Sequence, residues 1–191
     1  MDRDQQGLIS SPRRASREDK RWFALRATYN RELMVKDDLE QCGWECFVPM
    51  RVVKRERGSI VERRLEPSVH NLLFVHCTER ELKEYKRATT MPVRYIMNRV
   101  TRRPLVVPDG QMRSFMAVAN ATEEDVVYLT PKPGDFAAGE RVRIIGGVFK
   151  GAEGVFVRVK GDRRVVVSIE GVIAVATTFV HPSLLEKITD D

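Results

Sequence analysis

Hydrophobic positions in the first part of the chain switch between strand-like and helix-like spacing. A strand-like run at 21–25 (RWFAL) is followed by a segment typical of a helix. We expect Asn30 to cap this helix and Gly43 to end it, because the two residue types favour those positions. The apolar side chains expected on its inner face are Leu33, Val35 and Leu39.

The next segment predicts a long basic hairpin and then a buried strand. Residues 44–55 and 60–65 have strand-like patterns, and they flank a turn at 57–59. The continuous apolar run 72–75 (LLFV) is typical of a central strand that is covered on at least one face. The sequence TERE at 78–81 matches a capping box, in which hydroxyl and carboxylate groups satisfy free amides at a helix start.

Two further strands, at 94–97 and 105–107, are expected before a third helix that begins at Asp109. This helix has apolar residues at helical spacing, namely Met112, Phe115, Met116 and Ala119. Strands that alternate with three helices indicate an α+β domain, which we assign to residues 21–120. Residues 1–20 are polar and basic, and we expect them to form a disordered tail.

The last third of the chain has a different texture. Residues 121–134 lose periodicity and end in TPKPG, which predicts a linker. From 135 to 191 the chain consists of short Val- and Ile-rich runs separated by glycine turns; the runs are 142–145, 154–159, 165–169 and 172–176. Short strands of this kind bury a common interior by curling into a small β-barrel or sandwich.

Charge is distributed unevenly between the two parts. The formal net charge is +6 and the sequence pI is about 9.4. Residues 134–191 contain eight Lys or Arg and eight Asp or Glu, so the whole excess lies before them. The N-terminal part is therefore the expected neighbour of nucleic acid, although a solvated basic face that only maintains solubility gives the same count.

Cysteine usage and hydropathy bear on the compartment. The three cysteines, Cys42, Cys46 and Cys77, form no disulfide framework, and their odd number favours a reducing environment. No segment approaches the roughly twenty apolar residues of a membrane span, and the first twenty residues lack the apolar core of a signal peptide. We therefore expect a cytoplasmic protein.

The residues in two regions resemble those of one protein family. Residues 139–156 (GERVRIIGGVFKGAEGVF) resemble the KOW motif, whose glycines permit tight turns and close backbone approach. Residues 21–23, 47–49 and 66–75, with the basic hairpin between the last two, are similar in order to the NusG N-terminal (NGN) domain. Where many NusG proteins have an aromatic-Pro-Gly-Tyr signature, this chain has VHNL at 69–72.

Within the family, the sequence YIMN at 95–98 and the sequence PLVVPDGQM at 104–112 are similar to specialised NusG paralogues of the UpxY and RfaH types. UpxY proteins are antiterminators of capsular polysaccharide loci. The resemblance implies an NGN α/β sandwich followed by an SH3-like β-barrel, and an elongation or antitermination factor that suppresses pausing on selected long operons. It also implies binding to RNA polymerase through the coiled coil of the clamp.

The resemblance also implies positions for the contacts. The apolar polymerase-binding candidates are Trp22, Phe23, Val69, Leu72, Phe74 and Ile96, any of which could instead be ordinary core. The basic candidates for contact with DNA or nascent RNA are Arg51, Lys54, Arg55, Arg57, Arg63 and Arg64. The KOW positions are Gly139, Gly146, Gly147, Phe149, Lys150, Gly151 and Gly154.

The family's barrel recruits a second partner, either a ribosomal small-subunit protein or the terminator Rho. Candidates for that surface are Phe149, Ile169 and the edge formed by Val172 and Ile173, although they also suit a barrel interior. The alternative function is that of a KOW-type RNA-binding protein acting on the ribosome or on a leader transcript. That alternative predicts a basic barrel, whereas this one is neutral.

The sequence offers little support for a catalytic function or for a metal site. No recognisable catalytic signature surrounds His70, His76 or His181. The spacing of Cys42 and Cys46 is wrong for a zinc knuckle of the CxxC type. We expect neither an enzyme nor a bound cofactor.

Overall fold

The computed structural model describes residues 20–57, 60–121, 126–130, 139–159 and 161–189. The first sheet, here called the N-terminal sheet, is antiparallel and has the order β2-β5-β1-β6, with β7 also paired to β1. Its strands are β1 (Arg21–Ala27), β2 (Glu45–Phe47), β5 (Leu72–Cys77), β6 (Val93–Tyr95) and β7 (Val106–Val107).

Both faces of the N-terminal sheet are buried. Side chains alternate between the two faces of a strand, so Trp22 and Ala24 of β1 belong to one apolar cluster and Phe23 and Leu25 to another. The same alternation on β5 divides Leu72 and Phe74 from Leu73, Val75 and Cys77. These central strands therefore read as continuous apolar runs in the sequence, because neither face is open to water.

Two helices cover one face. Helix α1 (Glu32–Gln41) places Val35 and Leu39 in the cluster around Phe23, and α2 (Glu79–Ala88) adds Leu82. The third helix, α3 (Asp109–Ala119), covers the opposite face. Helix α2 begins with the capping box foreseen in the sequence: the Glu81 amide donates to Thr78 Oγ1 at 3.2 Å and the Thr78 amide to Glu81 Oε2 at 2.8 Å.

Two expectations for α1 are wrong. The residue before the helix is Arg31, which makes no capping hydrogen bond from its side chain, and Asn30 lies in the left-handed region at φ 53°. Leu33 is 40% exposed, and the buried stripe is formed by Glu32, Val35 and Leu39 instead. The end of the helix is as predicted, since Gly43 follows it at φ 79°.

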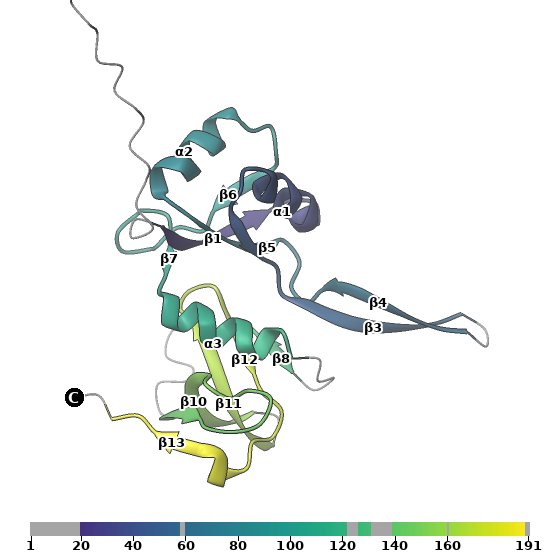
Figure 1. The fold of residues 1–191 in the computed structure, drawn as a ribbon, viewed down its shortest axis with the longest axis vertical. Coiled ribbons are helices and arrows are strands. Elements are labelled where there is room, and N and C mark those ends of the chain that lie inside the picture. Colours follow the sequence, from purple (N-terminus) through teal and green to yellow (C-terminus); the bar gives the residue numbers. More distant parts are fainter. Residues whose placement is uncertain (1–19, 58–59, 122–125, 131–138, 160, 190–191) are drawn as a thin grey trace, which may run out of the picture.

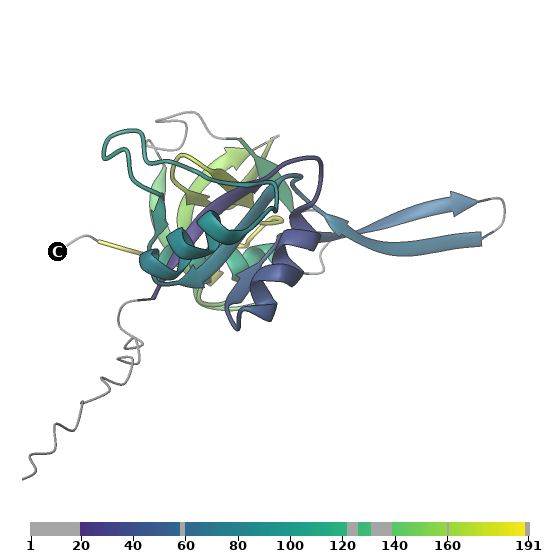
Figure 2. The ribbon, with the colours of Figure 1, turned by 90° about the horizontal axis from the view of Figure 1, so that it is seen from above.

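A long antiparallel ribbon projects from the edge of the N-terminal sheet (Figure 2). It consists of β3 (Met50–Arg57) and β4 (Ile60–Pro67), paired from Met50 with Pro67 to Arg57 with Ile60. Its turn at 58–59 lies outside the described residues. Because β2 leads directly into β3, the ribbon grows from the β2 edge of the sheet.

The second sheet, here called the C-terminal sheet, is also antiparallel and has the order β13-β9-β10-β11-β12-β8. Its strands are β8 (Val127–Leu129), β9 (Glu140–Ile144), β10 (Glu153–Val159), β11 (Asp162–Ile169), β12 (Ile173–Ala176) and β13 (Leu185–Lys187), and the short 3-10 helix η2 (Pro182–Leu184) precedes β13. Strand β8 lies within the range expected to be a linker. It belongs to the sheet because it pairs with β12.

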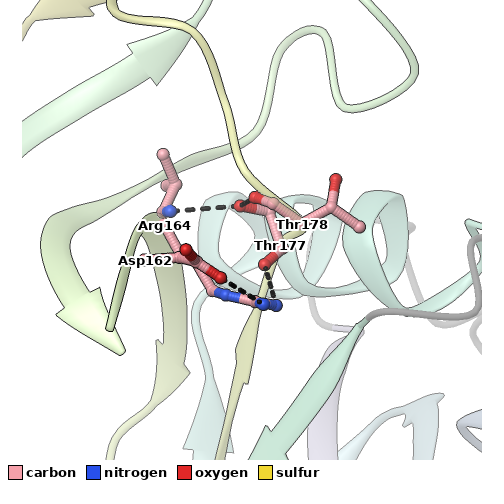
Figure 3. A network of polar contacts seen from close by, with 5 residues as sticks. Asp162, Arg164, Thr177 and Thr178 are labelled. Atoms are coloured by element: carbon pink, nitrogen blue, oxygen red, sulfur yellow. Dashed lines mark hydrogen bonds and ion pairs between the residues drawn. The ribbon is translucent and has the colours of Figure 1, made fainter. Parts of the chain in front are cut away.

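The end of β12 is held to β11 by a small polar network (Figure 3). Thr177 is fully buried, and its hydroxyl accepts a hydrogen bond from the Val165 amide at 3.1 Å and donates to the Thr178 carbonyl at 2.8 Å. The Arg164 guanidinium donates to the Thr177 carbonyl at 3.1 Å and pairs with Asp162 at 3.3 Å. The buried hydroxyl is thus satisfied, as a group removed from water requires.

Helix α3 lies between the two sheets (Figure 1). One apolar cluster runs from Trp22 and Phe74 of the N-terminal sheet, through Phe115 of α3, to Val165 and Val175 of the C-terminal sheet. The two parts of the chain therefore share a continuous hydrophobic core.

Candidate interaction surfaces

The apolar candidates for polymerase binding fall on two faces of the N-terminal sheet. Phe23 belongs to the cluster beneath α1 and α2 and is 1% exposed. The other five belong to the cluster on the α3 side or pack against it; they are Trp22, Val69, Leu72, Phe74 and Ile96. The structure thus brings five candidates together and separates Phe23 from them.

This face is covered in the structure. The Phe115 ring lies 5.6 Å from that of Phe74 and 6.2 Å from that of Phe47, measured between centroids. Trp22 and Leu72 are each 5% exposed and Phe74 is fully buried, whereas Val69 and Ile96 are partly buried. The latter two candidates are therefore the accessible part of the surface.

The loop that carries the VHNL sequence is anchored to the start of α1. Glu32 is 1% exposed, and its Oε1 atom lies 3.2 Å from His70 Nδ1. The Asn71 side chain accepts a hydrogen bond from the Asn30 amide at 3.0 Å, and Asn71 has a left-handed φ of 64°. The sequence analysis did not single out Glu32, because a lone glutamate at a helix start is usually solvated.

The basic candidates are distributed over both faces of the ribbon. Because neighbouring residues of a strand point to opposite faces, Lys54 and its cross-strand partner Arg63 share one face, and Arg51, Arg55 and Arg64 share the other. All five are exposed; the side chain of Arg57 lies outside the described residues. Arg55 pairs with Glu66 at 2.9 Å and Arg64 with Glu62 at 3.1 Å.

The face that holds Lys54 and Arg63 also exposes apolar side chains, which the sequence analysis did not single out. Val52, Val61 and Leu65 are 46%, 58% and 63% exposed, respectively. The sequence contained a signal for these side chains. Apolar and polar residues alternate along the two strands, which places the apolar ones on one face of a ribbon that no second sheet covers.

Comparison with known proteins identifies the family. Residues 20–116 match the family model described as "Transcription termination factor nusG". The chain belongs to the NusG family. A solved structure described as "Domain interaction in Thermotoga maritima NusG" aligns with a TM-score of 0.48 and 22% sequence identity, covering 91% of this chain and 100% of that one. No curated protein matches the chain.

The N-terminal α/β domain and the sheet-rich C-terminal domain agree with the NGN and SH3-like KOW folds of NusG proteins. In the KOW segment, Gly147 and Gly151 have φ values of 77° and 89°. A β-carbon on Gly154 would overlap the carbonyl oxygen of Val166, and one on Gly139 would overlap the side chain of Val155. Gly147 and Gly151 are therefore favoured by their backbone conformation, and Gly139 and Gly154 by the close approach of the neighbouring strand.

Most side chains considered for a second partner of the KOW domain are buried. Phe149, Ile169 and Ile173 are 4%, 1% and 4% exposed, and Val172 packs against the shared core. Lys150 is exposed. Among the residues of this domain that the structure describes, the large apolar side chains that are exposed are Ile145, Val148, Phe179 and Leu184.

Buried thiols in the NGN domain are poor metal ligands. Burial raises the pKa of Cys46 and that of Cys77 to about 12, and nearby carboxylates add to both shifts. A metal binds the thiolate, so a thiol that keeps its proton at neutral pH binds weakly. Within the described ranges, no group of three His, Cys, Asp or Glu is placed to hold a metal ion, and no helix has the length and apolar character needed to cross a membrane.

Proposed function

We propose that this NusG-family protein is a transcription elongation and antitermination factor that binds RNA polymerase through its NGN domain. The observation that carries the proposal is the family match over residues 20–116, since this segment holds both the apolar face and the basic ribbon. The protein acts in the cytoplasm on selected long operons such as capsular polysaccharide loci. Its similarity to UpxY-type proteins at residues 95–98 and 104–112 supports that specialisation.

Binding acts on the conformational equilibrium of the polymerase. The apolar face packs against the coiled coil of the clamp, and the rest of the domain reaches the other side of the DNA cleft. A factor with higher affinity for the closed, processive enzyme shifts the population by that difference in binding free energy. A difference of about 1.4 kcal/mol changes the equilibrium tenfold, so a modest interface suffices.

The ribbon supplies contacts to nucleic acid. Its exposed cations, Lys54 and Arg63 on one face and Arg51, Arg55 and Arg64 on the other, neutralise phosphates of DNA or nascent RNA in the elongation complex. Such contacts give affinity that depends on salt and little on sequence. The projection of the ribbon from the β2 edge lets it reach a phosphate backbone without disturbing the sheet.

The KOW domain recruits a second protein, either a ribosomal small-subunit protein or Rho. Its balanced charge suits a protein partner better than RNA. Exposed apolar side chains are available at Ile145, Val148 and Leu184, and the Leu184 side chain lies against Gly146. Affinity chromatography with purified Rho and the small-subunit protein distinguishes the two partners.

The polymerase contact is tested at an accessible position. Leu72 and Phe74 are unsuitable, because a charge at a buried position disrupts folding. Val69→Glu places a charge at the accessible part of the surface, and we expect it to weaken binding to core polymerase at least about tenfold, as a buried unpaired charge at an interface does. The matched control is Met91→Glu, at a partly buried position in the cluster on the opposite face.

Pull-down of core polymerase and a pausing assay provide the measurements. Loss of binding in Val69→Glu with retention in Met91→Glu supports the proposal, provided that both variants unfold cooperatively. Equal binding by wild type and Val69→Glu contradicts the assigned surface. Failure of the full-length protein to bind polymerase at low salt contradicts the function itself. Mapping of the transcripts that shorten when the protein is deleted tests operon specificity.

A further inference from the structure

A buried carboxylate lies beside the turn that joins the ribbon to β5. Glu32, in the first turn of α1, is 1% exposed, and its Oε1 atom lies 3.2 Å from Nδ1 of His70 in that turn. Its second oxygen, Oε2, is also buried and has no hydrogen-bond partner among the described residues. Figures 1 and 2 both show α1 beside the base of the ribbon, where the turn begins.

The burial of Glu32 opposes folding. Removal of a carboxylate from water is unfavourable unless its oxygens find hydrogen-bond donors, and here only one of the two does. The positive end of the α1 dipole offsets part of this loss. Val35 and Leu39, which continue the same stripe of α1, are apolar and fully buried. Packing alone therefore favours an apolar residue at position 32, and the carboxylate needs another explanation.

The two connections that meet beside Glu32 have unusual backbone conformations. Among the described residues, four that are not glycine have a positive φ, and three of them are here: Tyr29 at 61°, Asn30 at 53° and Asn71 at 64°. The Asn71 side chain accepts a hydrogen bond from the Asn30 amide at 3.0 Å, and the Ala27 amide donates to the Asn71 carbonyl at 3.1 Å. Such conformations persist only where surrounding contacts over-determine them, and they cluster at functional sites.

The contact with Glu32 fixes the imidazole of His70. An ionised carboxylate only accepts hydrogen bonds, so Nδ1 is the donor in this pair. In the neutral ring the other nitrogen, Nε2, is then a hydrogen-bond acceptor. The side chain of His70 is 59% exposed, so much of the ring remains available to a partner. Glu32 thus sets both the orientation and the tautomer of an exposed side chain.

This side chain is next to the proposed polymerase surface. His70 directly follows Val69, the accessible apolar candidate that packs against the cluster on the α3 side. A turn that is held before binding loses less conformational entropy when it binds. The contacts of Glu32 and Asn71 therefore prepare the turn for a partner that reaches both Val69 and His70.

We propose that Glu32 is a positioning residue for the polymerase contact: it holds His70 so that Nε2 accepts a hydrogen bond from a donor on the polymerase, beside the apolar contact of Val69. This role rests on the proposed function and adds a directional polar contact to it. Directional contacts contribute to specificity, because a partner that lacks the donor leaves a polar group unpaired.

Two substitutions at Glu32 separate positioning from packing. Glu32→Met introduces an adaptable apolar side chain that does not hold Nδ1, so it should be neutral or stabilising in urea denaturation. The same variant should bind core polymerase roughly three- to tenfold more weakly, because the turn is no longer held. Glu32→Gln keeps an oxygen that accepts from Nδ1, and it should bind within about twofold of wild type. A purely structural role predicts instead that affinity follows stability.

A double-mutant cycle tests the route through His70. His70→Ala should weaken binding by a similar factor, and the double variant with Glu32→Met should bind no more weakly than His70→Ala alone. The matched control is Asp38→Leu, which removes another α1 carboxylate, one that accepts a hydrogen bond from the Tyr85 hydroxyl at 2.6 Å. It should lose stability and keep its affinity. Titration of labelled core polymerase with full-length protein measures the affinity.

The position of the ring proton gives an independent measurement. At a pH of about 8, where an ordinary histidine is neutral, NMR of the ring nitrogens shows which of them carries the proton. We expect the proton of His70 on Nδ1 in the wild type and in Glu32→Gln, and a shift toward Nε2 in Glu32→Met.

Three results overturn the positioning role. The first is equal affinity of the wild type and Glu32→Met; Glu32→Leu provides a second apolar variant if the methionine variant does not unfold cooperatively. The second is an affinity that falls with stability in Asp38→Leu as it does in Glu32→Met. The third is additive effects of Glu32→Met and His70→Ala. All three leave polymerase binding by the wild type intact, whereas a wild-type protein that does not bind polymerase contradicts the proposed function as well.

Discussion

Gly154 and Gly110 show how the surroundings of one residue type decide the effect of the same substitution. A β-carbon on Gly154 would overlap the Val166 carbonyl oxygen in the neighbouring strand, whereas one on Gly110 in α3 meets only the end of the Arg113 side chain at 3.9 Å. We expect Gly154→Ala to reduce the free energy of unfolding by about 2 kcal/mol or more. Gly110→Ala should be neutral or stabilising by up to about 1 kcal/mol. Urea denaturation measures both, and equal effects would contradict the strand geometry.

Thr78 supplies a cap whose strength depends on pH. Burial raises the pKa of Glu81, but hydrogen bonds from the Thr78 amide and hydroxyl lower it more, so the net shift is downward from 4.5. A lowered pKa in the folded state stabilises the protein above the unfolded pKa, and this stabilisation is lost as pH falls through the folded value. We expect Thr78→Ala to cost about 1 kcal/mol at neutral pH.

The difference between wild type and Thr78→Ala should narrow when the pH falls below about 4.5, because protonated Glu81 accepts the hydroxyl hydrogen bond less strongly. Urea denaturation at several pH values gives the two profiles. Thr90→Ala, at an exposed threonine after the helix, serves as the control and should change little at any pH. A constant difference between Thr78→Ala and wild type would show that the carboxylate does not contribute.

Single residues were predictable where one local rule governs them. The capping box and Gly43 followed from side-chain chemistry and backbone freedom alone. The inner face of α1 was only partly predictable, because Val35 and Leu39 define a stripe whose next position toward the N-terminus is Glu32, three residues before Val35. Leu33 is more apolar, but helix geometry places it off that stripe, and Glu32 is tolerated beside His70 at a helix start.

At the scale of elements, α3 contributes to both domains. Phe115 is fully buried and contacts Phe47 and Phe74, and Ser114 Oγ accepts a hydrogen bond from the Glu153 amide of β10 at 3.1 Å. We expect Phe115→Ala to cost about 3–5 kcal/mol, because it leaves a cavity between two sheets. Phe179→Ala is the control, since Phe179 is 59% exposed. Chemical denaturation followed by tryptophan fluorescence measures the effect.

The position of β8 shows what periodicity cannot reveal about elements. A strand of three residues, Val127–Leu129, is too short to display alternation, and it forms because β12 offers an unpaired edge. The expected linker at 121–134 had the composition of a connection, which is a local property. Pairing with β12 is a non-local property, and so is the contact of α3 with the C-terminal sheet.

The same distinction applies to the candidate surfaces. Alternation on β1 already implies that Trp22 and Phe23 face opposite sides, so the separation of Phe23 from the other apolar candidates could be read from the sequence. The cover over that face could not, because it depends on packing between elements far apart in the chain.

At the scale of the whole molecule, the shared core implies that the proposed polymerase contact competes with domain docking. If polymerase uses the face that holds Trp22 and Phe74, it displaces part of the cover formed by α3 and the C-terminal sheet. The apparent affinity is then reduced by the fraction of molecules that are open. A substitution that weakens docking without touching the NGN surface should therefore strengthen polymerase binding.

Val172→Glu is such a substitution. Val172 packs against the shared core, and the adjacent Gly171 lies close to Leu105 of the NGN domain, so a carboxylate there opposes docking. We expect several-fold tighter binding to core polymerase, because the open fraction rises. Val148→Glu is the control: Val148 belongs to the same domain and is 66% exposed, so this substitution should leave the affinity unchanged.

Affinity is measured by titration of labelled polymerase, and the open fraction by hydrogen exchange at the amides of β1 and β5. If the affinity for polymerase is unchanged while hydrogen exchange becomes faster, polymerase does not use the covered face. If the affinity and the exchange rate rise together, polymerase binding requires release of the C-terminal sheet.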